Sequence, residues 1–116
     1  MRILYVEDNP IVREVTAELL EQPQRQIVAF GTAEEALNLF RSEAFDIVIT
    51  DVSLPVMSGM DLTRSILRER PQFPVIIASG YTLDFAVENW AANVRSIIKP
   101  FTAEDIDALI GQLLKV

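Results

Sequence analysis

The chain contains neither cysteine nor histidine among its 116 residues. Without cysteine it can form no disulfide, no thiolate metal site and no cysteine nucleophile. Without histidine it has no Ser-His-Asp triad, no imidazole ligand for a metal and no histidine that carries a phosphoryl group. These absences exclude several common kinds of catalytic and metal site.

Long apolar segments and clusters of basic residues are absent as well. No apolar run is long enough to cross a bilayer, and the N-terminal segment turns acidic too early to be a signal peptide. The sequence has 17 acidic and 10 basic residues, a net charge of −7, and its basic residues do not gather as they do in nucleic-acid-binding surfaces. We therefore expect no binding of nucleic acid or membrane by this domain, and a cytoplasmic location.

The residues that are present suit a folded domain. Half of them are hydrophobic, enough for a core, and the length fits a single domain spanning residues 1–116. Five short strand-like runs occur along the chain, and three of them are continuous and rich in valine and isoleucine, as in strands covered on both faces. The runs are Ile3–Val6, Ile27–Phe30, Ile47–Thr50, Val75–Ala78 and Ile97–Ile98.

A helix-like segment follows each strand-like run. In the first segment, Ile11, Val15 and Leu19 repeat every four residues and form its apolar stripe. The fourth segment, from about Leu83 to Ala91, is short and has a weaker stripe. The alternation of strands and helices predicts an α/β fold, a parallel sheet with helices on both faces. The segments begin at Asn9-Pro10, Thr32, Ser58-Gly59, about Leu83 and Thr102.

Polar residues stand where the strand-like runs end. Glu7 and Asp8 follow the first run, Asp51 the third, Ser79 the fourth and Lys99 the fifth. In open parallel sheets, ligands bind in the crevice at the carboxyl ends of the strands, so these side chains are expected to meet there. Acids gathered with a lysine favour a hard divalent cation such as Mg²⁺, whose ligands are oxygens, and a phosphoryl group.

Each of these residues also has an ordinary structural explanation. An aspartate such as Asp51 can turn the chain out of the sheet, and acids before a helix interact favourably with its dipole. A serine at a strand end is often a turn residue, and Lys99 can extend its charge to solvent along the surface. Only the combination, in this order, carries a functional interpretation.

In combination, the motifs resemble the response-regulator receiver domain of the CheY-like superfamily over the whole chain. The resemblance implies a flavodoxin-like (βα)5 fold, a doubly wound parallel sheet with strand order 2-1-3-4-5. The matching positions are Glu7-Asp8, Asp51, Leu54-Pro55, Met57-Ser58-Gly59 with Asp61, Ser79 and Lys99-Pro100-Phe101.

The resemblance also implies a role for each site residue. Asp51 is the expected acceptor of a phosphoryl group from a phosphohistidine of a sensor histidine kinase or a histidine phosphotransfer protein. Glu7, Asp8, Asp51 and the backbone carbonyl of Ser53 are the expected ligands of Mg²⁺. Ser79 and Lys99 are expected to contact the phosphoryl group, and a cis Lys99–Pro100 peptide would aim the lysine inward.

The chain is then a phosphoacceptor of a two-component or phosphorelay pathway rather than a turnover enzyme. Its phosphorylation would switch a protein-interaction surface toward an output protein of unknown identity. In one departure from the family pattern, Ser96 stands where an aromatic residue usually lies three positions before the lysine. We therefore expect the loop after the fourth strand, with Tyr81, to transmit the change.

Three alternatives belong to other functional classes. A phosphatase or mutase that forms an aspartyl phosphate normally has a second acid two residues after the nucleophile, where this chain has Ser53. A flavin carrier needs a Ser/Thr/Gly-rich phosphate loop after the first strand, where Glu7 and Asp8 would repel the phosphate. The third alternative, a receiver-like interaction module not regulated by phosphorylation, is disfavoured by the complete set of acids and lysine.

Overall fold

The structure is a computed structural model and describes residues 1–81 and 91–115. Most of the expected fourth helix, about Leu83 to Ala91, lies outside the described residues. In chain order, the elements are β1 (Arg2–Val6), α1 (Pro10–Leu20), β2 (Gln26–Phe30), α2 (Ala33–Ser42), β3 (Ile47–Asp51), α3 (Gly59–Glu69), β4 (Val75–Ser79), β5 (Val94–Ile98) and α4 (Ala103–Leu114).

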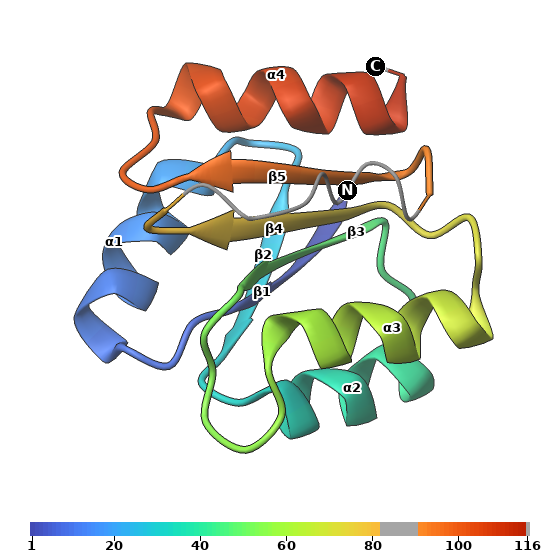
Figure 1. Ribbon diagram of the computed structural model, residues 1–116. Coiled ribbons are helices and arrows are strands. Elements are labelled where there is room, and N and C mark those ends of the chain that lie inside the picture. Colours follow the sequence, from blue (N-terminus) through green and yellow to red (C-terminus); the bar gives the residue numbers. More distant parts are fainter. Residues whose placement is uncertain (82–90, 116) are drawn as a thin grey trace.

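The five strands form one parallel sheet in the order β2-β1-β3-β4-β5. This order and the flavodoxin-like arrangement confirm the prediction from sequence. Helices α2 and α3 cover one face of the sheet, and α1 and α4 cover the other (Figure 1). No helix in the described part of the chain is both long and apolar enough to span a membrane.

Two apolar clusters, one on each face of the sheet, form the core. On the α2–α3 face the rings of Phe40 and Phe73 meet edge to face at 4.9 Å, beside the buried side chains of Leu62 and Ile66. On the α1–α4 face the largest buried side chain is that of Tyr5. The continuous burial of β3 and β4 agrees with their unbroken apolar sequences.

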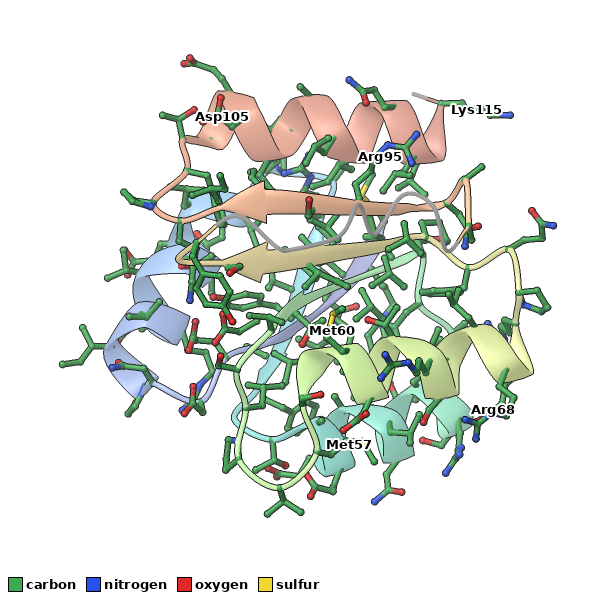
Figure 2. The ribbon with its side chains drawn as sticks, viewed as in Figure 1. Met57, Met60, Arg68, Arg95, Asp105 and Lys115 are labelled. Atoms are coloured by element: carbon green, nitrogen blue, oxygen red, sulfur yellow. The ribbon has the colours of Figure 1, made fainter. Side chains whose placement is uncertain are left out.

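The helices begin where the sequence predicts, because each start has a capping side chain. Asn9 accepts hydrogen bonds from the first turn of α1, and Thr32 and Ser58 do the same for α2 and α3. Thr102 and Asp105 form a reciprocal capping box at the start of α4. In Figure 2, Asp105 marks that start and Lys115 the other end of the helix.

Strand β5 is longer than the predicted run Ile97–Ile98. It begins at Val94, and Arg95 and Ser96 pair with Ile76 and Ile77 of β4. The polar residues Arg95 and Ser96 interrupt the apolar pattern, so the first part of this strand is not recognisable from the sequence. The ladder with β4 supplies the hydrogen bonds that keep them extended, so pairing overrides the local pattern.

The apolar stripe predicted for the first helix faces the core only at its end, where Leu19 packs against the cluster beneath α1 and α4. Ile11 is 75% exposed and Val15 58% exposed, whereas Leu20 is completely buried. A spacing of four residues advances about 40° around a helix at each step, so the members of such a stripe do not all face the sheet. In the structure, Ile11, Val15 and Leu19 line an open groove on the surface.

Candidate functional site

The five polar residues meet at the carboxyl edge of the sheet, as the sequence predicted. Glu7 and Asp8 follow β1, Asp51 ends β3, Ser79 ends β4 and Lys99 follows β5. Backbone hydrogen bonds fix these ends against one another: the Lys99 N–H donates to the Ser79 carbonyl at 2.7 Å. Strand order places β1 beside β3, which brings the acids of the two strands together.

Lys99 is the cation of this cluster. Its Nζ lies 2.9 Å from Oδ1 of Asp51 and 3.1 Å from Oε1 of Glu7. Among residues 1–81 and 91–115, it is the only cation in an ion pair with these acids. The Lys99–Pro100 peptide is cis, in agreement with the sequence-based prediction.

The three acids present the kind of ligands that Mg²⁺ prefers. One carboxylate oxygen each from Glu7, Asp8 and Asp51 lies within 4.8 Å of the others. Glu7 and Asp51 are buried, whereas Asp8 is exposed and faces solvent. An all-oxygen set that is open on one side suits a cation that keeps several waters and phosphate oxygens, so these residues fit the predicted metal.

Burial and charge shift the ionisation of the cluster. Burial raises the pKa of Glu7, and the nearby charge of Asp51 adds to this, while hydrogen bonds from Asn9 and Lys99 oppose it. Burial alone would lower the pKa of Lys99, but its hydrogen bonds to Asp51 and Glu7 outweigh burial and raise it. The surroundings therefore favour the protonated form of Lys99 and disfavour the charged form of Glu7.

Ser79 lies at the edge of the cluster with its side chain buried. Its Oγ accepts a hydrogen bond from the Tyr81 N–H at 3.2 Å, and a serine hydroxyl can also donate one hydrogen bond. Tyr81 is 59% exposed, and residues 82–90 lie outside the described residues. The side chain of Ser53 is exposed just after β3, and the metal-binding role of its carbonyl stays a prediction.

Gly59 allows the start of α3 to pack directly on the backbone of Asp51. A Cβ atom at position 59 would lie 2.0 Å from the Asp51 carbonyl oxygen, which no side chain can tolerate. The Gly59 N–H also donates to the carbonyl of Val52 at 3.0 Å. The glycine of the recognised motif therefore holds the segment that carries Asp51 against the helix.

Two further residues near the site were missed in the sequence. Tyr5 is 2% exposed beneath the cluster, and burial raises the pKa of its hydroxyl to about 12. Arg13 of α1 donates from Nη1 to the Glu7 carbonyl at 2.9 Å. Neither residue stands at a strand end, so the pattern that revealed the other five gave no signal for these two.

An open groove of about 560 Å³ borders the site on the α1 side. Lys99 lines this groove and also contacts Asp51, so this residue is shared by the groove and the acid cluster. Its apolar lining includes the exposed side chains of Ile11 and Val15. The lining residues are Ile11, Val12, Val15, Thr16, Leu19, Lys99, Pro100 and Phe101.

Comparison with known sequences gives consistent matches. Residues 3–111 match the model of the response regulator receiver domain. The chain is 33% identical to the sensor protein TorS of Escherichia coli over 119 residues, and 34% identical to the two-component response regulator PhoP of Pseudomonas aeruginosa over 118 residues. These alignments cover 100% and 99% of this chain, but 13% of TorS and 52% of PhoP. The chain thus spans about half or less of the length of these relatives.

Solved structures agree with the sequence matches. A response regulator receiver domain protein from Clostridium thermocellum superposes with a TM-score of 0.88 at 30% identity, covering 98% of this chain and 94% of that one. The response regulator protein TrrA of Thermotoga maritima, in complex with Mg²⁺–BeF, gives a TM-score of 0.87 at 30% identity, covering 97% and 98%.

Proposed function

The chain belongs to the response regulator receiver domain family, and from that premise we propose that Asp51 accepts a phosphoryl group in a two-component or phosphorelay pathway. Members of the family act in signalling rather than in substrate turnover. Because the chain contains no histidine, the donor histidine lies outside this chain, on a sensor histidine kinase or a histidine phosphotransfer protein.

The residues of the cluster have distinct tasks in this transfer. A carboxylate oxygen of Asp51 forms the new bond to phosphorus as the bond from phosphorus to the donor imidazole nitrogen breaks. Lys99, already 2.9 Å from Asp51, turns its ammonium to a phosphoryl oxygen and offsets the added charge. The Ser79 hydroxyl, whose oxygen accepts from the Tyr81 N–H, donates its proton to a second phosphoryl oxygen.

Glu7, Asp8 and Asp51, with the Ser53 carbonyl, would hold Mg²⁺. The ion supplies charge neutralisation for the phosphoryl oxygens when bound. Glu7 already bonds Lys99, so it is best placed to act through a water, while the exposed Asp8 is free to bind the ion directly. Support from relatives comes from TrrA, whose structure contains Mg²⁺–BeF.

One observation carries the proposal: the Asp51 carboxylate lies beside both an ammonium and two further acids, an arrangement that suits phosphoryl transfer. The test is intact-mass analysis after incubation with acetyl phosphate and Mg²⁺. We expect one phosphoryl group on the wild type, none on Asp51→Asn, and a normal gain on Asp61→Asn, which removes an exposed acid of α3. A phosphoryl group that persists on Asp51→Asn, or none on the wild type, would refute the assignment.

We further propose that the donor protein docks along the groove beside α1. A donor histidine must approach Asp51 from outside, and the groove leads to Lys99 at the site. Exposed apolar side chains such as Ile11 and Val15 suit an apolar helix face of the donor. The resulting surface would select the partner, while the cluster carries out the transfer.

A substitution at the groove separates docking from chemistry. Val15→Glu places a charge in the apolar lining of the groove, at an exposed position. It should therefore impair phosphorylation by a protein donor but leave phosphorylation by acetyl phosphate unchanged. Glu18→Gln, on the same helix but not in the lining, serves as the control. Equal loss with both donors would locate the defect in the site or the fold instead of in docking.

A further inference from the structure

Glu7 is the most extensively fixed residue of the acid cluster. Its N–H donates to the Phe30 carbonyl at 3.0 Å, and its two carboxylate oxygens accept from Lys99 at 3.1 Å and from the Asn9 N–H at 3.2 Å. The remaining group, the backbone carbonyl, accepts from Nη1 of Arg13 at 2.9 Å. Through Arg13, helix α1 therefore contacts the backbone of the acid pair.

Gly31, at the end of β2, makes room for this arginine. A Cβ atom at position 31 would lie 2.7 Å from Nη1 of Arg13, the same nitrogen that donates to Glu7. The next nearest atom to such a Cβ, also on Arg13, is 3.7 Å away, so an alanine would disturb the tip of this side chain and little else. The guanidinium thus occupies space that is available only because Gly31 has no side chain.

The bonded carbonyl belongs to the peptide that joins the two acids. A peptide unit is planar, so the carbonyl oxygen of Glu7 and the Cα atoms of Glu7 and Asp8 lie in one plane. A bond that fixes this oxygen also fixes the orientation of Asp8 relative to Glu7. Asp8 is exposed, and the carbonyl bond is therefore an important constraint on where its carboxylate points.

We propose that Arg13 is a positioning residue for the magnesium-binding acids, acting through the Glu7–Asp8 peptide and held in place by the absence of a side chain at Gly31. This inference rests on the magnesium site of the proposed function. Groups that orient metal ligands typically change metal affinity by tenfold or more when removed. The role is one of geometry, since the arginine bonds a backbone oxygen and not a carboxylate.

Arg13→Met tests the role by removing the donors while keeping the length of the side chain. Binding is measured as the competition of Mg²⁺ with Mn²⁺, followed through the paramagnetic signal of free Mn²⁺. We expect Arg13→Met to lower Mg²⁺ affinity by about tenfold. Arg68→Met, which removes the same charge from the exposed end of α3 (Figure 2), should bind as the wild type does.

Gly31→Ala distinguishes position from charge. It leaves the arginine in the chain but displaces its tip from the Glu7 carbonyl, so it should lower Mg²⁺ affinity as Arg13→Met does. The double variant should bind no more weakly than Arg13→Met alone, because both changes break the same contact. Urea unfolding without metal checks that all variants fold.

Each contrary result has a definite meaning. Wild-type affinity in both variants, with reduced stability in metal-free urea unfolding, would make Arg13 merely structural and overturn the inference. Weak binding in Arg13→Met with normal binding in Gly31→Ala would show that the position of the guanidinium beside Gly31 does not control the affinity, and also overturns the inference. A wild type that binds no Mg²⁺ would refute the metal site of the proposed function itself, and the positioning role with it.

Discussion

The amino ends of the strands form one edge of the sheet and the carboxyl ends form the opposite edge. These two edges are organised in opposite ways. At the amino edge, Arg2 forms favourable contacts with all of its recorded partners. It donates hydrogen bonds to Gln26, the Ala44 carbonyl and Glu43 at 2.8–2.9 Å. Its guanidinium also lies 4.4 Å from the centre of the Phe45 ring. Charges, hydrogen bonds and packing all favour the same arrangement.

At the carboxyl edge, like charges are brought together. Glu7, Asp8 and Asp51 present oxygens within 4.8 Å of one another, and Lys99 forms ion pairs with Glu7 and Asp51. Burial raises the pKa of Glu7, which means that the surroundings disfavour its charged form. The backbone ladder is equally regular at both edges, and strand pairing cannot explain the difference.

The contrast shows where stability and function lie in this fold. The contacts at the amino edge stabilise the sheet. At the carboxyl edge, the clustered acids lower stability, and a bound cation and phosphoryl group would offset their charges. Changes at the amino edge should therefore alter stability without altering chemistry. Changes at the carboxyl edge should alter chemistry, and several should stabilise the protein without metal.

The largest expected effect is stabilisation by Mg²⁺. Since the ion binds the folded acid cluster, a Mg²⁺ concentration about a hundredfold above the dissociation constant should raise the free energy of unfolding by about 2.7 kcal/mol. Asp8→Ala should remove most of this gain, because it removes a carboxylate ligand. Urea unfolding with and without Mg²⁺ measures both, and an equal gain in the two proteins would contradict the site.

The next effect belongs to the amino edge. Arg2→Met should lower the free energy of unfolding by about 2 kcal/mol, since it removes three hydrogen bonds and the contact with Phe45. The rate of phosphorylation by acetyl phosphate should not change. Arg68→Met is the control for loss of an exposed arginine. A slower reaction in Arg2→Met would show that the two edges are coupled.

A smaller effect concerns backbone strain at the carboxyl edge. Val56 has a φ of 67° and is 96% exposed, and the Met57 N–H bonds the Pro55 carbonyl across it at 2.8 Å. A β-branched residue rarely adopts this left-handed conformation. Val56→Asn should raise the free energy of unfolding by about 1 kcal/mol, as asparagine accepts it more readily. Unchanged stability would mean that the loop carries no strain at Val56.

The smallest expected effect is a difference in pH dependence. The pKa of Glu7 in the folded state is raised above its ordinary value of 4.5, so its favourable contribution is complete below that value and is lost as pH rises through the raised pKa. Without metal, the wild type should lose stability relative to Glu7→Gln across that window. Urea unfolding at a series of pH values tests this, and parallel curves for the two proteins would rule it out.

The sequence by itself determined the order of the elements and most of the site. Continuous runs such as Val75–Ala78 predict buried strands, and polar residues at their ends predict which side chains share the carboxyl edge. The strand order followed from the resemblance of Asp51, Lys99 and their neighbouring motifs to one family. These features are local or follow from a known topology, so the chain alone reveals them.

Only the tertiary structure decided how distant residues meet. The stripe of Ile11 and Val15 lines a groove instead of the core, because the orientation of α1 depends on what it packs against. Arg13 reaches the Glu7 carbonyl only because Gly31, eighteen positions further along by number, leaves a slot for it. Periodicity in the sequence tells which residues share a face of a helix or strand. Contacts between elements depend instead on register and on approach distances of a few ångströms, and a local sequence pattern contains neither.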